Sequence, residues 1–437
     1  MSRQVVFSIA GILSFLSVLQ ESPAQPQVTD VVARSVAPLQ IGERVTGQTE
    51  PGEIFALITR QDQRIWVQND EGKKGWLASD QVVDLKQAEP IYEALIRREP
   101  GRAVHFERRA QHWTSRGELA KALADYERAI QLGSKNPTVY LNRGIQHSTS
   151  GQFEQAVTDF DRVIALGMTD AHVYVNRGVA RFAMGEFDQA IADFDQAVDG
   201  GVKSFSIYVN RAAAKLAANQ EVMAIDDLNE AIRLEPENPA GYFERGRAWQ
   251  QLDKPDQAIE DFGRALELDA DYVRAYAGRG YAWFVKGESE KAVADFDRVI
   301  QRQPQSAGAY NNRGFNQQRL GRYAEALADF RRAIELAPKY LLAYQNAAWL
   351  LATCPDDQIR DGRASRQIAV KAQQLSDEDD LPAGLMKALA AAHAENGEFD
   401  KAVDWQKQVI GQMPEDERAE EQKLLDLYRS EKPYRMD

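Results

Sequence analysis

The feature that most constrains this chain is a residue pattern that returns every 34 positions along most of its length. Eight units begin at Ala103, Pro137, Ala171, Phe205, Pro239, Val273, Ala307 and Leu341, and a ninth begins at Ala383 after eight extra residues. A unit of this length accommodates two helices and a turn, and one such pair cannot bury its apolar face alone. The pattern therefore predicts a mainly α-helical fold in which helical pairs stack into an α-solenoid.

Small residues recur at two positions of the units and predict where the paired helices touch. The first position holds Ala110, Gly144, Gly178, Ala212, Gly246, Gly280, Gly314, Ala348 and Ala390. The second holds Ala122, Ala156, Ala190, Ala224, Ala258, Ala292, Ala326 and Ala402. Four residues after the second position comes a large apolar residue, such as Tyr126 or Phe160. Two antiparallel helices approach closely only where both carry minimal side chains, and the large residue fills the wider end of the gap.

These positions and their spacing resemble the tetratricopeptide repeat. The resemblance implies a right-handed superhelix of helical hairpins over residues 103–416, with about nine units and an insertion at 354–382. Residues 86–102 match the second half of a preceding unit and predict a connecting or capping helix. Residues 417–437 are expected to form a C-terminal capping helix and tail. The stretches Asn346–Asp356, Arg360–Gly362 and Glu398–Gln406 resemble the terminal module of exported bacterial repeat proteins, which implies no biochemical activity.

Residues 28–85 differ in character from the repeats. The runs Ile54–Ile58 and Ile65–Val67 are rich in β-branched and aromatic residues and are separated by polar turn segments. Together with the second tryptophan, Trp76, they resemble a bacterial Src-homology-3-like domain, which predicts a small all-β barrel. The resemblance implies a cell-wall or peptide ligand, and the alternative is that Trp66 and Trp76 only fill a small core.

The first 24 residues read as a secretory signal peptide. Arg3 precedes a 15-residue apolar run, Val5–Leu19, and Ser22-Pro23-Ala24 supplies small residues for cleavage. The run is short for a membrane span, which needs about 20 apolar residues. The sequence therefore predicts export to the periplasm or the extracellular space, with an uncleaved N-terminal anchor as the alternative.

Charge and residue usage exclude several classes of function. With 53 Lys+Arg against 66 Asp+Glu the net charge is −13, which disfavours nucleic-acid binding. The single cysteine, Cys354, permits no intramolecular disulfide and no thiolate zinc cluster. The five histidines lack metal-binding spacing, and neither a Gly-x-Ser-x-Gly elbow nor a phosphate-binding loop is present. We therefore expect no enzyme, no cofactor, no metal, and no membrane association after signal cleavage.

Two charged positions repeat in register with the units. Arginine occupies Arg109, Arg143, Arg177, Arg211, Arg245, Arg279 and Arg313. Aspartate follows 16 residues later at Asp125, Asp159, Asp193, Asp227, Asp261, Asp295 and Asp329. Each arginine stands beside a small contact residue, and partly buried charges are normally paired. The pattern predicts a repeated structural ion pair between helices rather than a catalytic or anion-binding site.

Candidate ligand-binding residues lie on the first helix of each pair. The resemblance places asparagines at this position on the inner face of the superhelix, where their amides can pair with an extended peptide backbone. Three residues further along, the later units carry aromatic rings suited to side-chain pockets. The predicted peptide-binding residues are Asn142, Asn176, Asn210, Asn312, Asn346, Tyr281, Phe315 and Trp349. The alternatives are that the asparagines only cap or solvate helices and that the rings only seal neighbouring units.

These observations predict an exported protein–protein interaction scaffold that captures a peptide or protein partner on the concave face of the solenoid. The β domain would then be a second recognition site. Two alternatives remain open: a regulatory or targeting subunit of a cell-envelope hydrolase, and a purely structural component of the envelope.

Overall fold

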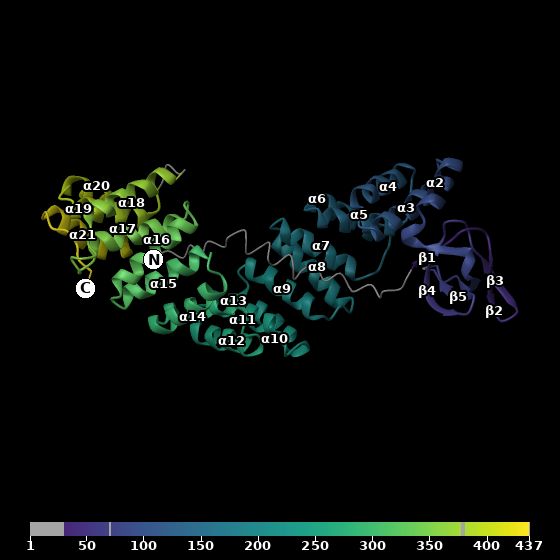
Figure 1. Cartoon of the computed structure of the whole chain (residues 1–437), viewed down its shortest axis with the longest axis horizontal. Coiled ribbons are helices and arrows are strands. Elements are labelled where there is room, and N and C mark those ends of the chain that lie inside the picture. Colours follow the sequence, from purple (N-terminus) through teal and green to yellow (C-terminus); the bar gives the residue numbers. More distant parts are fainter. Residues whose placement is uncertain (1–29, 70, 377–380, 437) are drawn as a thin grey trace. The chain divides into compact units, whose positions relative to one another are not determined.

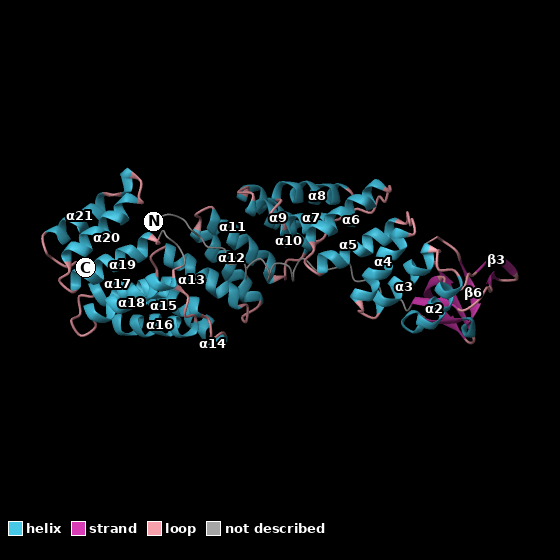
Figure 2. Cartoon of the chain, turned by 90° about the horizontal axis from the view of Figure 1, so that it is seen from above, coloured by secondary structure: helices cyan, strands magenta, loops and turns pink. Residues whose placement is uncertain are grey.

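The structure is a computed structural model that describes residues 30–69, 71–376 and 381–436. An antiparallel sheet precedes an array of helices, which confirms the predicted mainly α-helical fold (Figures 1 and 2). The predicted signal peptide, residues 1–24, lies outside the described residues. Within the described ranges, every helix is too short or too polar to cross a membrane. The chain forms two compact units, Met1–Leu234 and Glu235–Asp437, and each is described by itself.

The sheet of the first unit has seven strands in the order β3-β2-β6-β5-β4-β1-β7. Their bounds are β1 Asp30–Ala33, β2 Pro38–Ile41, β3 Arg44–Gln48, β4 Ile54–Gln61, β5 Arg64–Gln68, β6 Lys74–Ala78 and β7 Val82–Asp84. Among the described strands, β3 and β7 are the two edges and do not pair with each other. The predicted small all-β domain is therefore present, as an open sheet rather than a closed barrel.

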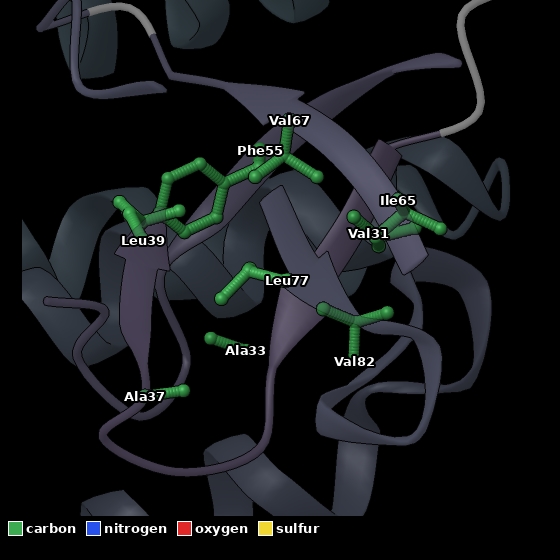
Figure 3. Packing of buried hydrophobic residues seen from close by; sticks show 9 residues of the cluster. All are labelled: Val31, Ala33, Ala37, Leu39, Phe55, Ile65, Val67, Leu77 and Val82. Atoms are coloured by element: carbon green, nitrogen blue, oxygen red, sulfur yellow. The ribbon is translucent and has the colours of Figure 1, made fainter. Parts of the chain in front are cut away.

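One face of the sheet carries its apolar core (Figure 3). The core residues are Val31, Ala33, Ala37, Leu39, Phe55, Ile65, Val67, Leu77 and Val82. Successive side chains of a strand point to opposite faces, so Trp66, between buried Ile65 and Val67, lies on the other face. Trp66 and Trp76 oppose each other across β5 and β6, with ring centroids 5.6 Å apart and planes at 73°. Both are half-buried, so the interpretation that they fill the sheet core is wrong.

Helix α2 (Glu89–Arg98) joins the sheet to the helical array. Its buried Tyr92 and Leu95 pack with Val32 and Leu85 of the sheet end, and the Tyr92 hydroxyl donates to the Gly52 carbonyl at 3.3 Å. Burial raises the pKa of Tyr92, so the hydroxyl stays protonated and can act as a donor. The sheet and the first helical pair are thus connected through packed side chains.

Each repeat unit forms two helices of 12 to 14 residues, and the first helices begin at or next to the residues expected from the 34-residue period. In the first compact unit the helices are α3 Ala103–Ser115, α4 Leu119–Gln131, α5 Pro137–Thr149, α6 Phe153–Ala165, α7 His172–Ala183, α8 Phe187–Asp199, α9 Phe205–Ala217 and α10 Glu221–Leu234. In the second they are α11 Pro239–Gln251, α12 Pro255–Leu268, α13 Val273–Val285, α14 Ser289–Arg302, α15 Ala307–Arg319, α16 Tyr323–Leu336, α17 Leu341–Thr353, α18 Gly362–Leu375, α19 Ala383–Glu395, α20 Phe399–Gly411 and α21 Ala419–Arg429. Helix α18 lies within the predicted insertion and pairs with α17, so that segment supplies a second helix.

Small residues set the distance between paired helices, as the sequence predicts. A Cβ atom on Gly144 would lie 2.8 Å from Cε1 of Phe160, and one on Gly178 would lie 2.8 Å from Cε1 of Phe194. These separations are too short for carbon atoms, so any larger side chain would push the helices apart. The nesting of each pair therefore depends on glycine or alanine at this position.

The turn inside each pair needs a backbone with positive φ. Glycine provides it at Gly117, Gly151, Gly185, Gly287, Gly321 and Gly397. In two of the three units without this glycine, Asn219 (φ 57°) and Asp253 (φ 59°) adopt the same conformation, whereas the third, which contains α17 and α18, has Pro355 in this place and no positive φ at residues 354–361. Asparagine and aspartate tolerate the left-handed region better than other non-glycine residues, so the turn keeps its geometry in these two units.

Candidate functional site

The repeated arginines and aspartates form a ladder of ion pairs between the two helices of each unit. In all seven pairs the arginine donates through Nε and Nη2 to both carboxylate oxygens, at 2.5–3.0 Å. The hydrogen bonds to Asp125 raise the pKa of Arg109, which keeps the guanidinium charged. The predicted structural ion pair is confirmed, and its two-pronged geometry fixes how the helices align.

Three arginines of the ladder also contact the preceding unit. The third guanidinium nitrogen, Nη1, donates to an aspartate 16 residues earlier. The bonds are Arg177 to Asp161 at 2.6 Å, Arg211 to Asp195 at 2.8 Å, and Arg313 to Asp297 at 2.6 Å. Each of these arginines therefore holds one acid within its own unit and one acid of its neighbour. The charge of each of these three arginines is therefore paired within the fold on both sides, which favours a structural role.

The predicted asparagines lie on first helices, as expected, but in different environments. Asn142, Asn176 and Asn312 are half-buried, whereas Asn210 and Asn346 are only 3% and 8% exposed. The structure brings Asn346 and Asn312 together through Asn311, which sequence analysis did not single out. Asn346 Nδ2 donates to Asn311 Oδ1 at 2.9 Å, and Asn311 Nδ2 donates to Asn312 Oδ1 at 3.3 Å. Amides from α15 and α17 thus form one polar chain along these first helices.

The predicted aromatic residues fall into two groups. Tyr281 of α13 is 44% exposed and contacts Phe284, whose ring lies 5.5 Å from Phe315 of α15 in an edge-to-face arrangement. Phe315 also packs against the buried residues of α16 and α17. Trp349 of α17 does not join this row, because its ring lies 5.7 Å from Tyr434 of the chain's own C-terminus. Tyr281 is the most accessible of the three.

Sequence analysis predicts a C-terminal tail, but it does not predict the contacts that residues 432–436 of this tail make. It follows α21 without regular secondary structure and touches three first helices of the second compact unit. The Met436 N–H donates to the carbonyl of Thr353 at 2.9 Å, and Gln318 Nε2 donates to Met436 Sδ at 3.2 Å. The available signal was an aromatic and an apolar residue, Tyr434 and Met436, beyond the last helix.

An ion pair and ring contacts complete the seat of the tail. Arg435 Nη1 lies 2.6 Å from Glu395 Oε2 at the end of α19. The Trp349 ring contacts the ring of Tyr434. It also contacts Lys387 of α19, whose Nζ lies 5.2 Å from the Trp349 ring centroid. We define the first-helix face as the surface of α13, α15, α17 and α19 that carries Tyr281, Gln318, Trp349, Thr353 and Glu395. An extended segment with an aromatic, a basic and an apolar residue in sequence fills part of this face.

Catalytic chemistry finds little support among the described side chains. In residues 30–69, 71–376 and 381–436 there is no cluster of three or more His, Cys, Asp or Glu side chains that could hold a metal. Cys354 is fully buried, and burial raises the pKa of its thiol, so it is poorly placed to act as a nucleophile.

Family models for the tetratricopeptide repeat match four stretches of the chain: residues 113–148, 141–204, 243–307 and 307–340. Among curated proteins, none matches the sequence significantly. A repeat protein from Parabacteroides merdae is 18% identical and covers 68% of this chain and 100% of its own, with a TM-score of 0.44. The C-terminal part of a repeat protein from Cytophaga hutchinsonii is 17% identical, with 55% and 98% coverage and a TM-score of 0.46. Yeast Tom70 is 14% identical, with 79% and 92% coverage and a TM-score of 0.43.

Proposed function

From the premise that residues 113–204 and 243–340 are tetratricopeptide repeats, we propose that this chain is a non-enzymatic scaffold that binds an extended segment of a partner protein. Tetratricopeptide repeats generally serve as protein–protein interaction scaffolds. The binding site of the proposal is the first-helix face, with Asn312, Asn346, Tyr281, Phe315 and Trp349 as its residues. In the first compact unit, Asn142, Asn176 and Asn210 stand at the equivalent position of the repeat.

The observation that carries the proposal is the C-terminal tail on the first-helix face. The tail is bound through a ring contact at Trp349, a backbone hydrogen bond at Thr353 and an ion pair at Glu395. These are the three kinds of contact by which proteins hold extended peptides: an aromatic anchor, a main-chain hydrogen bond and a charge pair. A face that accepts this segment in the same chain has the chemistry to accept a similar segment from another protein.

The exposed end of the face extends the site beyond the tail. Tyr281 and Phe284 lie on α13, one unit before the helices that the tail touches, and their rings are 5.9 Å apart. Exposed aromatic surface next to a filled peptide seat supplies a second pocket for a longer ligand. Phe315 packs edge-to-face against Phe284, so its proposed role is to hold the Phe284 ring in place.

The proposal predicts that the tail can be supplied as a separate peptide. A chain that ends at Arg429 keeps α21 whole and frees the seat, so a fluorescent peptide of residues 430–437 should bind it saturably. The intact chain should bind the same peptide at least ~10-fold more weakly, because a tethered segment competes at high effective concentration. Fluorescence anisotropy measures both affinities, and circular dichroism checks that the shortened chain is folded.

Two matched peptides make this test specific. Replacing Tyr434 or Arg435 by alanine in the peptide should weaken binding, as should Trp349→Ala or Glu395→Gln in the shortened chain. A change of the exposed second-helix residue Arg331→Ala should leave binding unaltered. If the folded, shortened chain does not bind the peptide, or binds it equally well without Trp349 and Glu395, the proposed site is wrong.

We also propose that the sheet is a second recognition surface. Trp66 and Trp76 form a half-buried edge-to-face pair on the face away from the core, and Arg64 lies 5.8 Å from the Trp76 ring centroid. Such a pair suits a peptide or a cell-wall ligand, and two modest sites on one chain gain affinity by avidity. Titration of muropeptides or short peptides should quench tryptophan fluorescence in the natural chain and not in Trp76→Ala. An identical response in both would remove this surface from the proposal.

Location and alternatives follow from the same proposal. We infer that the chain is exported by its N-terminal segment, either cleaved or retained as an anchor, and N-terminal sequencing of the protein from its native cells distinguishes the two. The alternative functions are a regulatory or targeting subunit of a cell-envelope hydrolase and a structural envelope component. Hydrolysis of peptidoglycan or peptides by the purified chain would contradict the non-enzymatic proposal.

A further inference from the structure

In the second compact unit, one repeat lacks an acidic residue that most other repeats carry. Five of the seven ladder arginines follow an acidic residue by 16 positions: Glu93, Glu127, Asp161, Asp195 and Asp297 precede Arg109, Arg143, Arg177, Arg211 and Arg313. Before Arg279 the same position is Gly263. Before Arg245 the position holds Asn229. In three units the acid at this position accepts a hydrogen bond from Nη1 of the arginine, and at Gly263 the position has no side chain.

The missing acid leaves a hydrogen-bond donor of Arg279 unused. Its Nε and Nη2 donate to Asp295 at 2.8 and 2.7 Å, as in the other units. Its Nη1 has no hydrogen-bond partner among the described residues, whereas the equivalent atom of Arg313 donates to Asp297 at 2.6 Å. The Arg279 side chain is also the most exposed of the seven, at 26%. One charged arm thus faces open space in a fixed orientation.

Neither packing nor backbone conformation requires glycine at this position. Gly263 lies inside α12 without a positive φ, and an added Cβ would meet only Arg279 Nη1, at 3.9 Å. A glycine inside a helix costs about 1 kcal/mol relative to alanine. By contrast, Gly246 and Gly278 each press against the ring of Phe262. The effect of Gly263 on the structure is to leave room in front of Arg279.

That room is a cavity of about 570 Å³ between α11, α12 and α13. Its charged lining includes Arg245, Arg264 and Arg279, together with the acids Glu260, Asp261 and Glu267. Asp261 accepts both bonds from Arg245, and Glu267 accepts from Arg264 at 2.7 Å. Arg279 Nη1 therefore remains available to a ligand. The exposed carboxylate of Glu260 opposes a multiply charged anion and leaves room for a single carboxylate.

We propose that this cavity binds the carboxylate of an aspartate or glutamate side chain from a partner protein, held by Arg279 Nη1 in the place that Asp161, Asp195 and Asp297 occupy in other units. The partner's carboxylate completes the ladder at the one position where the chain supplies no side chain. The site lies on α11–α13 and does not depend on the first-helix face, so it can hold while the peptide proposal fails. If the site is as proposed, a partner that binds along α11–α13 carries an aspartate or glutamate that contacts Arg279.

The test observes the guanidinium of Arg279 directly. In a chain labelled with 15N-arginine, titration with N-acetyl-glutamate N-methylamide should shift the Arg279 guanidinium resonances saturably. Gly263→Asp should weaken this binding at least ~10-fold, because the chain's own carboxylate then occupies the site. Gly263→Ala is the matched control, since its Cβ leaves Nη1 free and binding should persist. Arg279→Lys identifies the resonance and should abolish the response.

A second variant creates the site elsewhere and separates binding from folding defects. Asp297→Gly removes the acid that holds Arg313 Nη1, and the Arg313 resonances should then respond to the same probe. The proposal is overturned if the Arg279 resonances do not shift, if Gly263→Asp leaves the response unaltered, or if inorganic phosphate binds as tightly as the carboxylate probe.

Discussion

Asp227→Ala is expected to lower the local stability of α9 and α10 by about 3–5 kcal/mol, because it removes the acid shared by buried Lys215 and half-buried Arg211. Asp227 is 3% exposed and accepts from Arg211 Nε at 2.9 Å and Nη2 at 2.5 Å. It also accepts from Lys215 Nζ at 2.7 Å, and Lys215 is itself only 6% exposed. Removing one carboxylate therefore leaves an ammonium and a guanidinium without their shared partner. Amide hydrogen exchange of the two helices measures the loss, since repeat arrays open locally.

The neighbouring unit offers a matched control on the same arginine. Asp195 accepts from Arg211 Nη1 at 2.8 Å, but its side chain is 49% exposed. An exposed ion pair contributes roughly 0–1 kcal/mol, so Asp195→Ala should change exchange in α9 by less than about 1 kcal/mol. Equal effects of Asp227→Ala and Asp195→Ala would show that burial does not set the strength of the ladder.

Gly246→Val is expected to destabilise the α11–α12 pair by about 3 kcal/mol through overpacking. The ring of Phe262 is fully buried, and a Cβ on Gly246 would lie 2.8 Å from its Cε1 and 2.9 Å from its Cδ1. Gly278 of α13 also presses against this ring, because a Cβ there would lie 2.7 Å from its Cζ. The ring cannot move away, so the helices must separate. Urea unfolding followed by circular dichroism, with hydrogen exchange of α11 and α12, measures the effect.

The control for this prediction is a helical glycine with free space. Nothing lies within 4 Å of a Cβ built on Gly308 in α15. Gly308→Ala should therefore keep or raise stability, by up to about 1 kcal/mol from helix propensity. If Gly246→Val is as stable as Gly308→Ala, close helix approach at the small residues does not hold the pair together.

The helical part of the fold could be predicted because its determinants are local. The 34-residue period places the first helices, and the small residues that make helix contact lie within the same unit as the ring they face, as Gly144 does with Phe160. The ladder follows from the same spacing, since Arg109 and Asp125 lie on consecutive helices. Positive-φ turns at Asn219 and Asp253 were not foreseen, because neither residue requires that conformation.

The sheet and the site were harder to predict because they depend on contacts between distant residues. Whether the edges β3 and β7 meet, and which face Trp66 takes, depends on strand order and register rather than on composition. The C-terminal tail has no periodicity, so its seat on Gln318, Trp349 and Thr353 could not be derived from the pattern of the units. The sequence predicted the aromatic residues of α13, α15 and α17, but it did not predict that Tyr434 contacts Trp349.

The most direct test of the central claim, that first helices hold an extended segment, is site-specific photo-crosslinking from residue 434. In the full chain at low concentration, benzoylphenylalanine in place of Tyr434 should crosslink within the same molecule to α17, at or next to Trp349. An excess of the 430–437 peptide should reduce that crosslink, and mass spectrometry maps the sites. Tyr434 also packs against the apolar cluster of α19, α20 and α21, so crosslinks there agree with the structure. Crosslinks that map only elsewhere in the chain, or none within the chain, would contradict the account.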